Sequence, residues 1–84
     1  MEIVWDEPKR LLNLAKHGFD FAELTEAFFE AAAIVPAKQG RYLAIGDFNG
    51  IAVVAVVIRP LGAEAVSVIS MRRADRQERR MLDG

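Results

Sequence analysis

The sequence predicts a single α+β domain. We expect an antiparallel sheet of three or four strands, packed by two N-terminal helices and followed by a C-terminal helix. Three observations support this prediction: two helical patterns before residue 31, three strand patterns joined by tight turns over residues 41–71, and a charged helical pattern after them. With 84 residues, 52% of them apolar, the chain can form one small core, so we assign residues 1–84 to one domain.

The first helix is predicted from its end signals. It follows a short strand or extended segment, Glu2–Trp5. Asp6 suits the N-cap, Pro8 suits the first turn, and Gly18 suits the position just after a last turn that ends at His17.

This helix should have two different sides, because residues three and four apart share a side. The apolar side, which we expect to face the core, contains Leu11, Leu12, Leu14 and Ala15. The polar side contains Lys9, Asn13, Lys16 and His17.

A second helix is predicted to start at the capping box of Asp20 and Glu23 and to run to about Glu30. Phe19 and Leu24 have the spacing of a hydrophobic staple across its first turn. The inward face is expected to contain Phe21, Leu24, Ala27 and Phe28.

Two strands are predicted around the hairpin signal Asn49-Gly50, which joins Arg41–Phe48 to Ile51–Arg59. The run Ile51–Ile58 is apolar on both sides, so we expect it in the middle of the sheet. Ahead of this hairpin, Ile34-Val35 could form a short edge strand.

The third strand, Glu64–Met71, is predicted after a turn at residues 60–62, and it ends in a basic segment. Arg72 and Arg73 follow the strand, and the pair Asp75 and Glu78 forms the capping box of a third helix. Five arginines lie within residues 72–80. Arginine suits phosphate because its planar fork matches two oxygens. Neighbours on a strand point to opposite faces, so we expect only one of Arg72 and Arg73 to face a site.

The composition of the chain narrows the range of functions that it can have. The net charge of −1 combines a balance of −4 over residues 1–30 with +2 over residues 59–84, so a local nucleic-acid site near the C-terminal helix is compatible with it. With no cysteine and one histidine, we expect no metal site and no cofactor. No apolar run is long enough for a membrane span, and the acidic N-terminal segment is unlike a signal peptide. These features are compatible with a cytoplasmic location without demanding it, and we expect no membrane binding.

No phosphate-binding loop, dinucleotide motif or serine triad is present. The remaining Lys, His, Arg and Glu side chains suffice for metal-free cleavage of RNA. In that reaction the 2′-hydroxyl attacks the adjacent phosphate, cations stabilise the developing charge, and a side chain moves the proton.

Five short segments give the chain a resemblance to a known family. They are Trp5-Asp6-Glu7-x-Lys9, Asn13-x-x-Lys16-His17-Gly18, Arg41-x-x-x-Ile45-Gly46, Ile69-Ser70-x-Arg72-Arg73-Ala74 and Glu78-Arg79-Arg80. In this order they resemble the BrnT family of type II toxins, ribonucleases with a RelE-like fold. The resemblance implies a cytoplasmic toxin that cleaves RNA, a BrnA-like antitoxin encoded beside it, and DNA binding only through that antitoxin.

On these grounds we predict catalytic roles for Lys16, His17, Arg72 and Arg73 and substrate binding by Lys9, Asn13, Arg41 and Arg76. We expect the first helix and the end of the last strand to converge. Simpler interpretations stay open: solvated helix lysines, a histidine that caps a helix, an arginine that protects an edge strand, and Glu78 as a capping residue. The alternative function is an inactive binding module that acts only in a complex with its antitoxin.

Overall fold

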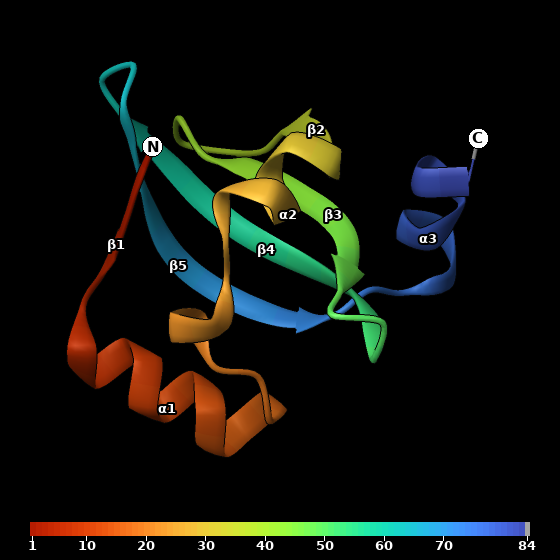
Figure 1. Ribbon diagram of the computed structural model, residues 1–84, viewed down its shortest axis with the longest axis horizontal. Coiled ribbons are helices and arrows are strands. Elements are labelled where there is room, and N and C mark those ends of the chain that lie inside the picture. The colour runs from red at the N-terminus through yellow and green to blue at the C-terminus, as the bar shows by residue number, and fades with distance from the viewer. Residues whose placement is uncertain (84) are drawn as a thin grey trace.

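The computed structural model describes residues 1–83, which form five strands, three α-helices and one 3₁₀ turn (Figure 1). In chain order these are β1 (Glu2–Trp5), α1 (Glu7–His17), η1 (Phe21–Glu23), α2 (Glu26–Ala31), β2 (Ala33–Pro36), β3 (Tyr42–Phe48), β4 (Ala52–Leu61), β5 (Ala65–Arg73) and α3 (Arg76–Asp83).

The strands form one five-stranded mixed sheet in the order β1-β5-β4-β3-β2. The predicted meander is present, since β3, β4 and β5 pair antiparallel, and the apolar strand β4 is central as expected. The prediction of an all-antiparallel sheet of three or four strands is wrong, because β1 pairs in parallel with β5 at the edge. This pairing joins opposite ends of the chain, so no local pattern in the sequence indicates it.

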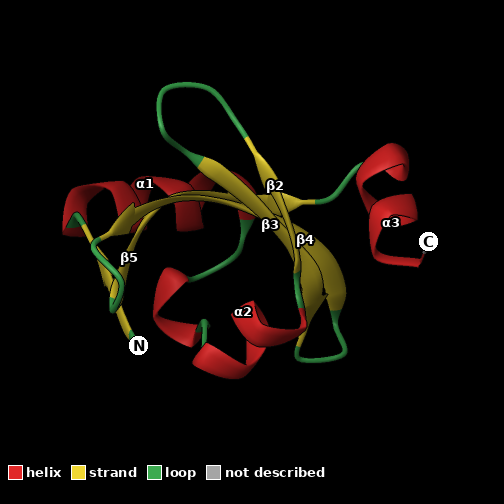
Figure 2. Cartoon of the chain, turned by 90° about the horizontal axis from the view of Figure 1, so that it is seen from above, coloured by secondary structure: helices red, strands yellow, loops and turns green. Residues whose placement is uncertain are grey.

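The main core lies on one face of the sheet, which we call the helix-covered face. Figure 2 shows η1 and α2 within the curve of the sheet and α3 on its other side. Apolar side chains from η1, α2 and alternate positions of β3, β4 and β5 fill this core. Gly46 in β3 permits the close approach, because a Cβ there would lie 3.0 Å from the Phe28 ring.

The other face of the sheet, which we call the open face, is covered only at one end. There α3 packs on β3 through a second small cluster, in which Leu82 of α3 packs against the buried residues Ile45, Ala55 and Ala74. Further along this face, Leu43 and Val57 are only half-buried. The open face therefore offers a large part of the sheet to a ligand or partner.

The predicted second helix is divided in two. Asp20 caps only the 3₁₀ turn η1, by accepting from the N–H of Ala22, and Leu24 then adopts an extended conformation. Thr25 caps α2 through a hydrogen bond from the Phe28 N–H to its hydroxyl. A Thr hydroxyl competes for backbone donors, which favours a cap over a helix interior. Ala27, predicted to face inward, is exposed.

The predicted apolar side of α1 is also wrong. Leu11 and Leu12 are 53% and 71% exposed, and Ala15 is exposed as well. The buried residue of this helix is Asn13, on the side predicted to be polar. The physical reason is the position of α1 beside the edge of β5, where backbone groups of the strand need hydrogen-bond partners.

The strand ends at the C-terminal half differ from the prediction. β4 extends through Pro60 to Leu61, so the turn begins at Gly62. The φ of Gly62, 65°, lies in the left-handed region, which glycine adopts readily. Arg72 and Arg73 lie within β5, and an irregularity in the pairing of β4 with β5 lies between Val57 and Ile58.

Within residues 1–83, none of the helices has the length and apolar character that a membrane crossing requires.

Candidate functional site

The polar side of α1 and the middle of β5 form a shallow hollow of about 220 Å³, which we call the α1–β5 hollow. It brings together the four residues of α1 that were predicted for the site, against Ile69 and Ser70 of β5: Lys9, Asn13, Lys16 and His17. The predicted convergence of the first helix with the last strand is therefore present, although its centre lies at Ser70 and not at the terminal arginines.

Asn13 joins the two sides of this hollow. Its Nδ2 donates to the carbonyl oxygen of Met71 at 2.8 Å, and its Oδ1 accepts from the Met71 N–H at 3.1 Å. The side-chain amide thus replaces a neighbouring strand beyond the end of β1, which pairs only with residues 65–68 of β5. The residue is 8% exposed, so its amide holds the helix on the strand and is not open to a substrate.

Arg10 fixes the orientation of α1 against the segment that follows it. Its Nη1 donates to both carboxylate oxygens of Asp20, at 3.0 and 3.1 Å, while its Nε and Nη2 donate to the two oxygens of Glu7. Hydrogen bonds from Arg10 and then from the Trp5 indole lower the pKa of Glu7 to about 2. The Ala22 N–H and then Arg10 hold the pKa of Asp20 below its usual value. Both carboxylates stay ionised at neutral pH, so the ion pairs of Arg10 with Glu7 and Asp20 are intact under physiological conditions.

Arg72 is held by Glu78 at the start of α3. Its two terminal nitrogens donate to the two Glu78 oxygens at 2.8 and 2.9 Å. The predicted capping box is confirmed, because the Asp75 N–H donates to Glu78 and the Glu78 N–H donates to Asp75. The Arg72 hydrogen bonds are the main reason that the pKa of Glu78 lies below its usual value, despite a side chain only 10% exposed. This pair attaches α3 to β5 and uses both terminal nitrogens of Arg72.

Arg73 has a different environment. As expected for strand neighbours, it lies on the face opposite to Arg72. Its guanidinium lies 5.8 Å from the centre of the Phe19 ring, two residues beyond His17, so it is placed near the C-terminal end of α1. Arg73 is exposed, and within residues 1–83 no carboxylate forms an ion pair with it. Of the two arginines, Arg73 is the one whose charge is open to a ligand.

The other predicted substrate contacts lie outside the α1–β5 hollow. Arg41 immediately precedes β3. It lies two positions before Leu43, so alternation along the chain places it on the open face of the sheet with Leu43. Its Nε is buried, with no hydrogen-bond partner among the described residues. Arg76 is exposed at the first position of α3. Neither arginine is therefore among the residues that line the α1–β5 hollow.

Three residues of the hollow were missed from the sequence: Leu12, Ile69 and Ser70. Leu12 lies three residues after Lys9 and four before Lys16, a spacing that places it among the site residues of the helix. Ser70 lies two residues before Arg72, and its place on the strand could have been inferred from that arginine.

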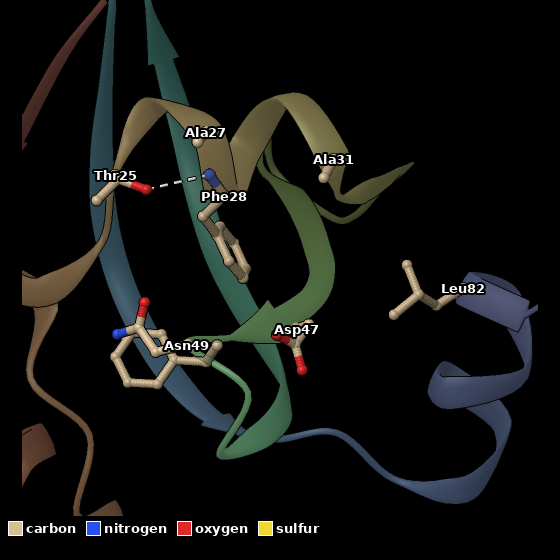
Figure 3. A pocket seen from close by; sticks show the side chains of 8 residues that line it. Thr25, Ala27, Phe28, Ala31, Asp47, Asn49 and Leu82 are labelled. Carbon is tan, nitrogen blue, oxygen red and sulfur yellow. Dashed lines mark hydrogen bonds between the residues drawn. The ribbon is translucent and has the colours of Figure 1, made fainter.

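A larger hollow of about 400 Å³ lies between α2, the end of β3 and α3 (Figure 3). Figure 3 shows the Phe28 ring between the helix and the strand, with Leu82 facing the gap from α3. Asp47 is its one charged lining residue. This hollow therefore lacks the cations that a phosphate ligand requires, in contrast to the α1–β5 hollow. Across residues 1–83 no three His, Cys, Asp or Glu side chains are grouped so as to hold a metal ion.

Comparisons with known proteins agree with the resemblance of the sequence segments. Residues 5–78 match the family model of the ribonuclease toxin BrnT of type II toxin–antitoxin systems. The fold is similar to the 1.1 Å crystal structure of the Brucella abortus ribonuclease toxin BrnT, with a TM-score of 0.85 and 55% sequence identity, over 90% of this chain and 99% of that one. A comparison with curated proteins finds no match. The chain belongs to the BrnT family of type II ribonuclease toxins.

Proposed function

We propose that this toxin cleaves RNA in the α1–β5 hollow, without a metal ion, by attack of the 2′-hydroxyl on the adjacent phosphate. The observation that carries the proposal is the grouping of Lys9, Lys16 and His17 against Ser70, with Arg73 beside the end of the same helix. A cationic hollow on a fixed scaffold can bind the phosphate and move protons, which are the two requirements of this reaction.

The proposed chemistry follows from the side chains present. A basic group removes the 2′-hydroxyl proton, the oxygen forms a bond to phosphorus, and the bond from phosphorus to the 5′-oxygen breaks. The 5′-oxygen then takes a proton, which leaves a 2′,3′-cyclic phosphate on one product. We assign proton transfer to His17, because an imidazole can donate or accept a proton near neutral pH. Lys16 and Arg73 stabilise the charge on the phosphate oxygens.

Other predicted residues receive supporting roles in this proposal. Lys9 lies two helical turns before Lys16 on the same side of α1 and contacts a flanking phosphate. Arg41 and Arg76 bind more distant phosphates of the RNA. Arg72 stays with Glu78 and holds the strand end in place, and Asn13 holds α1 on β5.

A type II toxin has an antitoxin partner, and we propose that a BrnA-like antitoxin covers the α1–β5 hollow. Leu12, 71% exposed, stands among the lysines and offers an apolar contact at the centre of that surface. Covering the hollow would exclude RNA directly. DNA contacts of the complex are assigned to the antitoxin.

The proposal is tested by incubating the purified chain with RNA in buffer that contains EDTA, with and without ribosomes. Cleavage is expected, with 2′,3′-cyclic phosphate ends on the products. An RNA with a single 2′-deoxy nucleotide at a mapped cleavage position should resist cleavage there. Cleavage of the 2′-deoxy site, or cleavage only when a divalent cation is added, would refute the mechanism. If the RNA stays intact under all these conditions, the proposed ribonuclease function is wrong, and the binding-only function should replace it.

A further inference from the structure

A second, apolar hollow of about 330 Å³ opens on the helix-covered face, at the end of the sheet far from α3. Its floor contains Ile58 and Val66 from the central strands, and Phe29 of α2 forms one wall. Ile34 and Tyr42 stand at its rim, 47% and 37% exposed. The hollow carries no group of the proposed reaction, because the α1–β5 hollow lies at the other side of β5.

Carboxylates surround this hollow. On α2, Glu26 and Glu30 flank the lining residue Phe29, and both are exposed. Glu2 and Glu64 line an adjoining depression, and Met1 belongs to the lining of both. The Met1 ammonium lies among these acids and forms an ion pair with Glu26. Four exposed acids against this one cation still leave a net negative field at this end of the sheet, opposite in sign to that of the α1–β5 hollow.

The edge of β2 adds a third feature. β2 is the last strand of the sheet, so its outer backbone groups have no strand partner among the described residues. Ile34 belongs both to this edge and to the lining of the hollow. An extended segment that pairs with β2 would therefore place alternate side chains beside the hollow.

We infer that the apolar hollow and the β2 edge dock an extended segment of the antitoxin, which carries apolar side chains at alternate positions and lysine or arginine beside them. The inference rests on the proposed function only in that the partner is the antitoxin of this toxin. Charge selects the occupant: an apolar floor with an excess of carboxylates beside it favours an apolar segment with basic flanks. Acidic segments are suited to the α1–β5 hollow, so the two surfaces receive different parts of one partner.

The location of the apolar hollow makes this arrangement possible. Its lining residues Tyr42 and Pro60 adjoin Arg41 and Arg59, which alternation places on the open face. A segment docked in the hollow therefore lies beside residues whose immediate neighbours in the sequence face the opposite side of the sheet. The docked segment anchors the antitoxin, while a separate part covers the site.

The experiment measures the affinity of the protein encoded beside this gene for folded single variants. Ile34→Lys and Glu30→Lys should each weaken binding about tenfold or more, because each opposes the apolar or acidic character of the hollow. Matched controls are Ile51→Lys, at an apolar residue 71% exposed in the β3–β4 turn, and Glu23→Lys in η1. Both controls should bind like the parent. Hydrogen exchange should slow at β2 in the complex.

Two results would overturn the docking inference. One is parental affinity in both Ile34→Lys and Glu30→Lys. The other is a dimer of the parent chain that Ile34→Lys dissociates, which would make a second copy the occupant. RNA cleavage by the free variants should equal that of the parent. A parent that binds its partner through the hollow but cleaves no RNA would support docking while refuting the proposed reaction.

Discussion

At the scale of single residues, Asn13 explains how a polar helix side can pack on a sheet. Its amide presents one donor and one acceptor to Met71, 58 residues further along the chain. Its neighbours on the same side of the helix, Lys9, Lys16 and His17, are thereby brought to Ser70 without needing an apolar interface of their own. One buried amide thus positions the basic groups of the site.

Replacing Asn13 by Ala should therefore destabilise the protein. The change leaves the N–H and carbonyl of Met71 buried without partners, and we expect the free energy of unfolding to fall by about 2–3 kcal/mol. Urea denaturation measures this loss. Leu12→Ala, at an exposed neighbour on the same helix, should shift the unfolding free energy by less than about 0.5 kcal/mol. Equal losses in the two variants would show that the amide has no special role.

Residue patterns in the sequence predicted the local contacts well and the distant ones poorly. The capping box of Asp75 and Glu78 is confirmed because its two residues are three apart. The role of Asn13 was not predicted, because its partner Met71 lies far away in sequence. Asn13 was instead assigned to the substrate. The lysines and His17 were grouped correctly, since helical spacing alone places them together.

At the scale of elements, the Arg72–Glu78 pair attaches α3 to the end of β5. The folded state lowers the pKa of Glu78, chiefly through the Arg72 hydrogen bonds. A lowered carboxyl pKa stabilises the fold above the ordinary value of 4.5, and this stabilisation is lost as the pH falls through the lowered folded pKa.

Glu78→Gln should remove this effect. At pH 7 we expect the variant to lose about 1–2 kcal/mol of unfolding free energy, since Arg72 is partly exposed and solvent weakens the pair. The difference from the parent should narrow as the pH is lowered below 4.5, because the unfolded parent protonates Glu78 first and the folded parent protonates it only at the lowered pKa. Denaturation at several pH values measures the loss of unfolding free energy at pH 7 and its decrease at low pH. A difference that stays constant down to low pH would contradict the assigned charge pairing.

The element boundaries show where local signals compete. Asp20 and Thr25 are both good caps, five residues apart, and each starts its own short element. The sequence favoured one continuous helix because its apolar spacing is helical throughout. The extended conformation of Leu24 comes from tertiary packing, which buries this side chain in the core. Similarly, β1 gains its place in the sheet from pairing with β5, which no local pattern reveals.

At the scale of the whole molecule, the fold separates charges that lie close together in the sequence, since Lys9 and Lys16 and the acids Glu2, Glu26 and Glu30 all come from residues 1–30. Basic groups gather where α1 meets β5, and acidic groups surround the apolar hollow on the helix-covered face. The central position of β4 and the antiparallel meander were predictable from apolar runs and turn residues. The positions of the two hollows were not, because each is built from segments far apart in the sequence: α1 and β5 in one case, and α2 with strands β2 to β5 in the other.

The central claim is that the α1–β5 hollow is the site of RNA cleavage, and the rate of metal-free cleavage by His17→Ala and Arg73→Ala tests it most directly. Each variant, with its fold checked by circular dichroism, should cleave about 10²–10³-fold more slowly than the parent. Arg80→Ala, which removes an exposed cation of α3 outside the hollow, should retain the parental rate. Parental rates in folded His17→Ala and Arg73→Ala would show that the reaction occurs elsewhere.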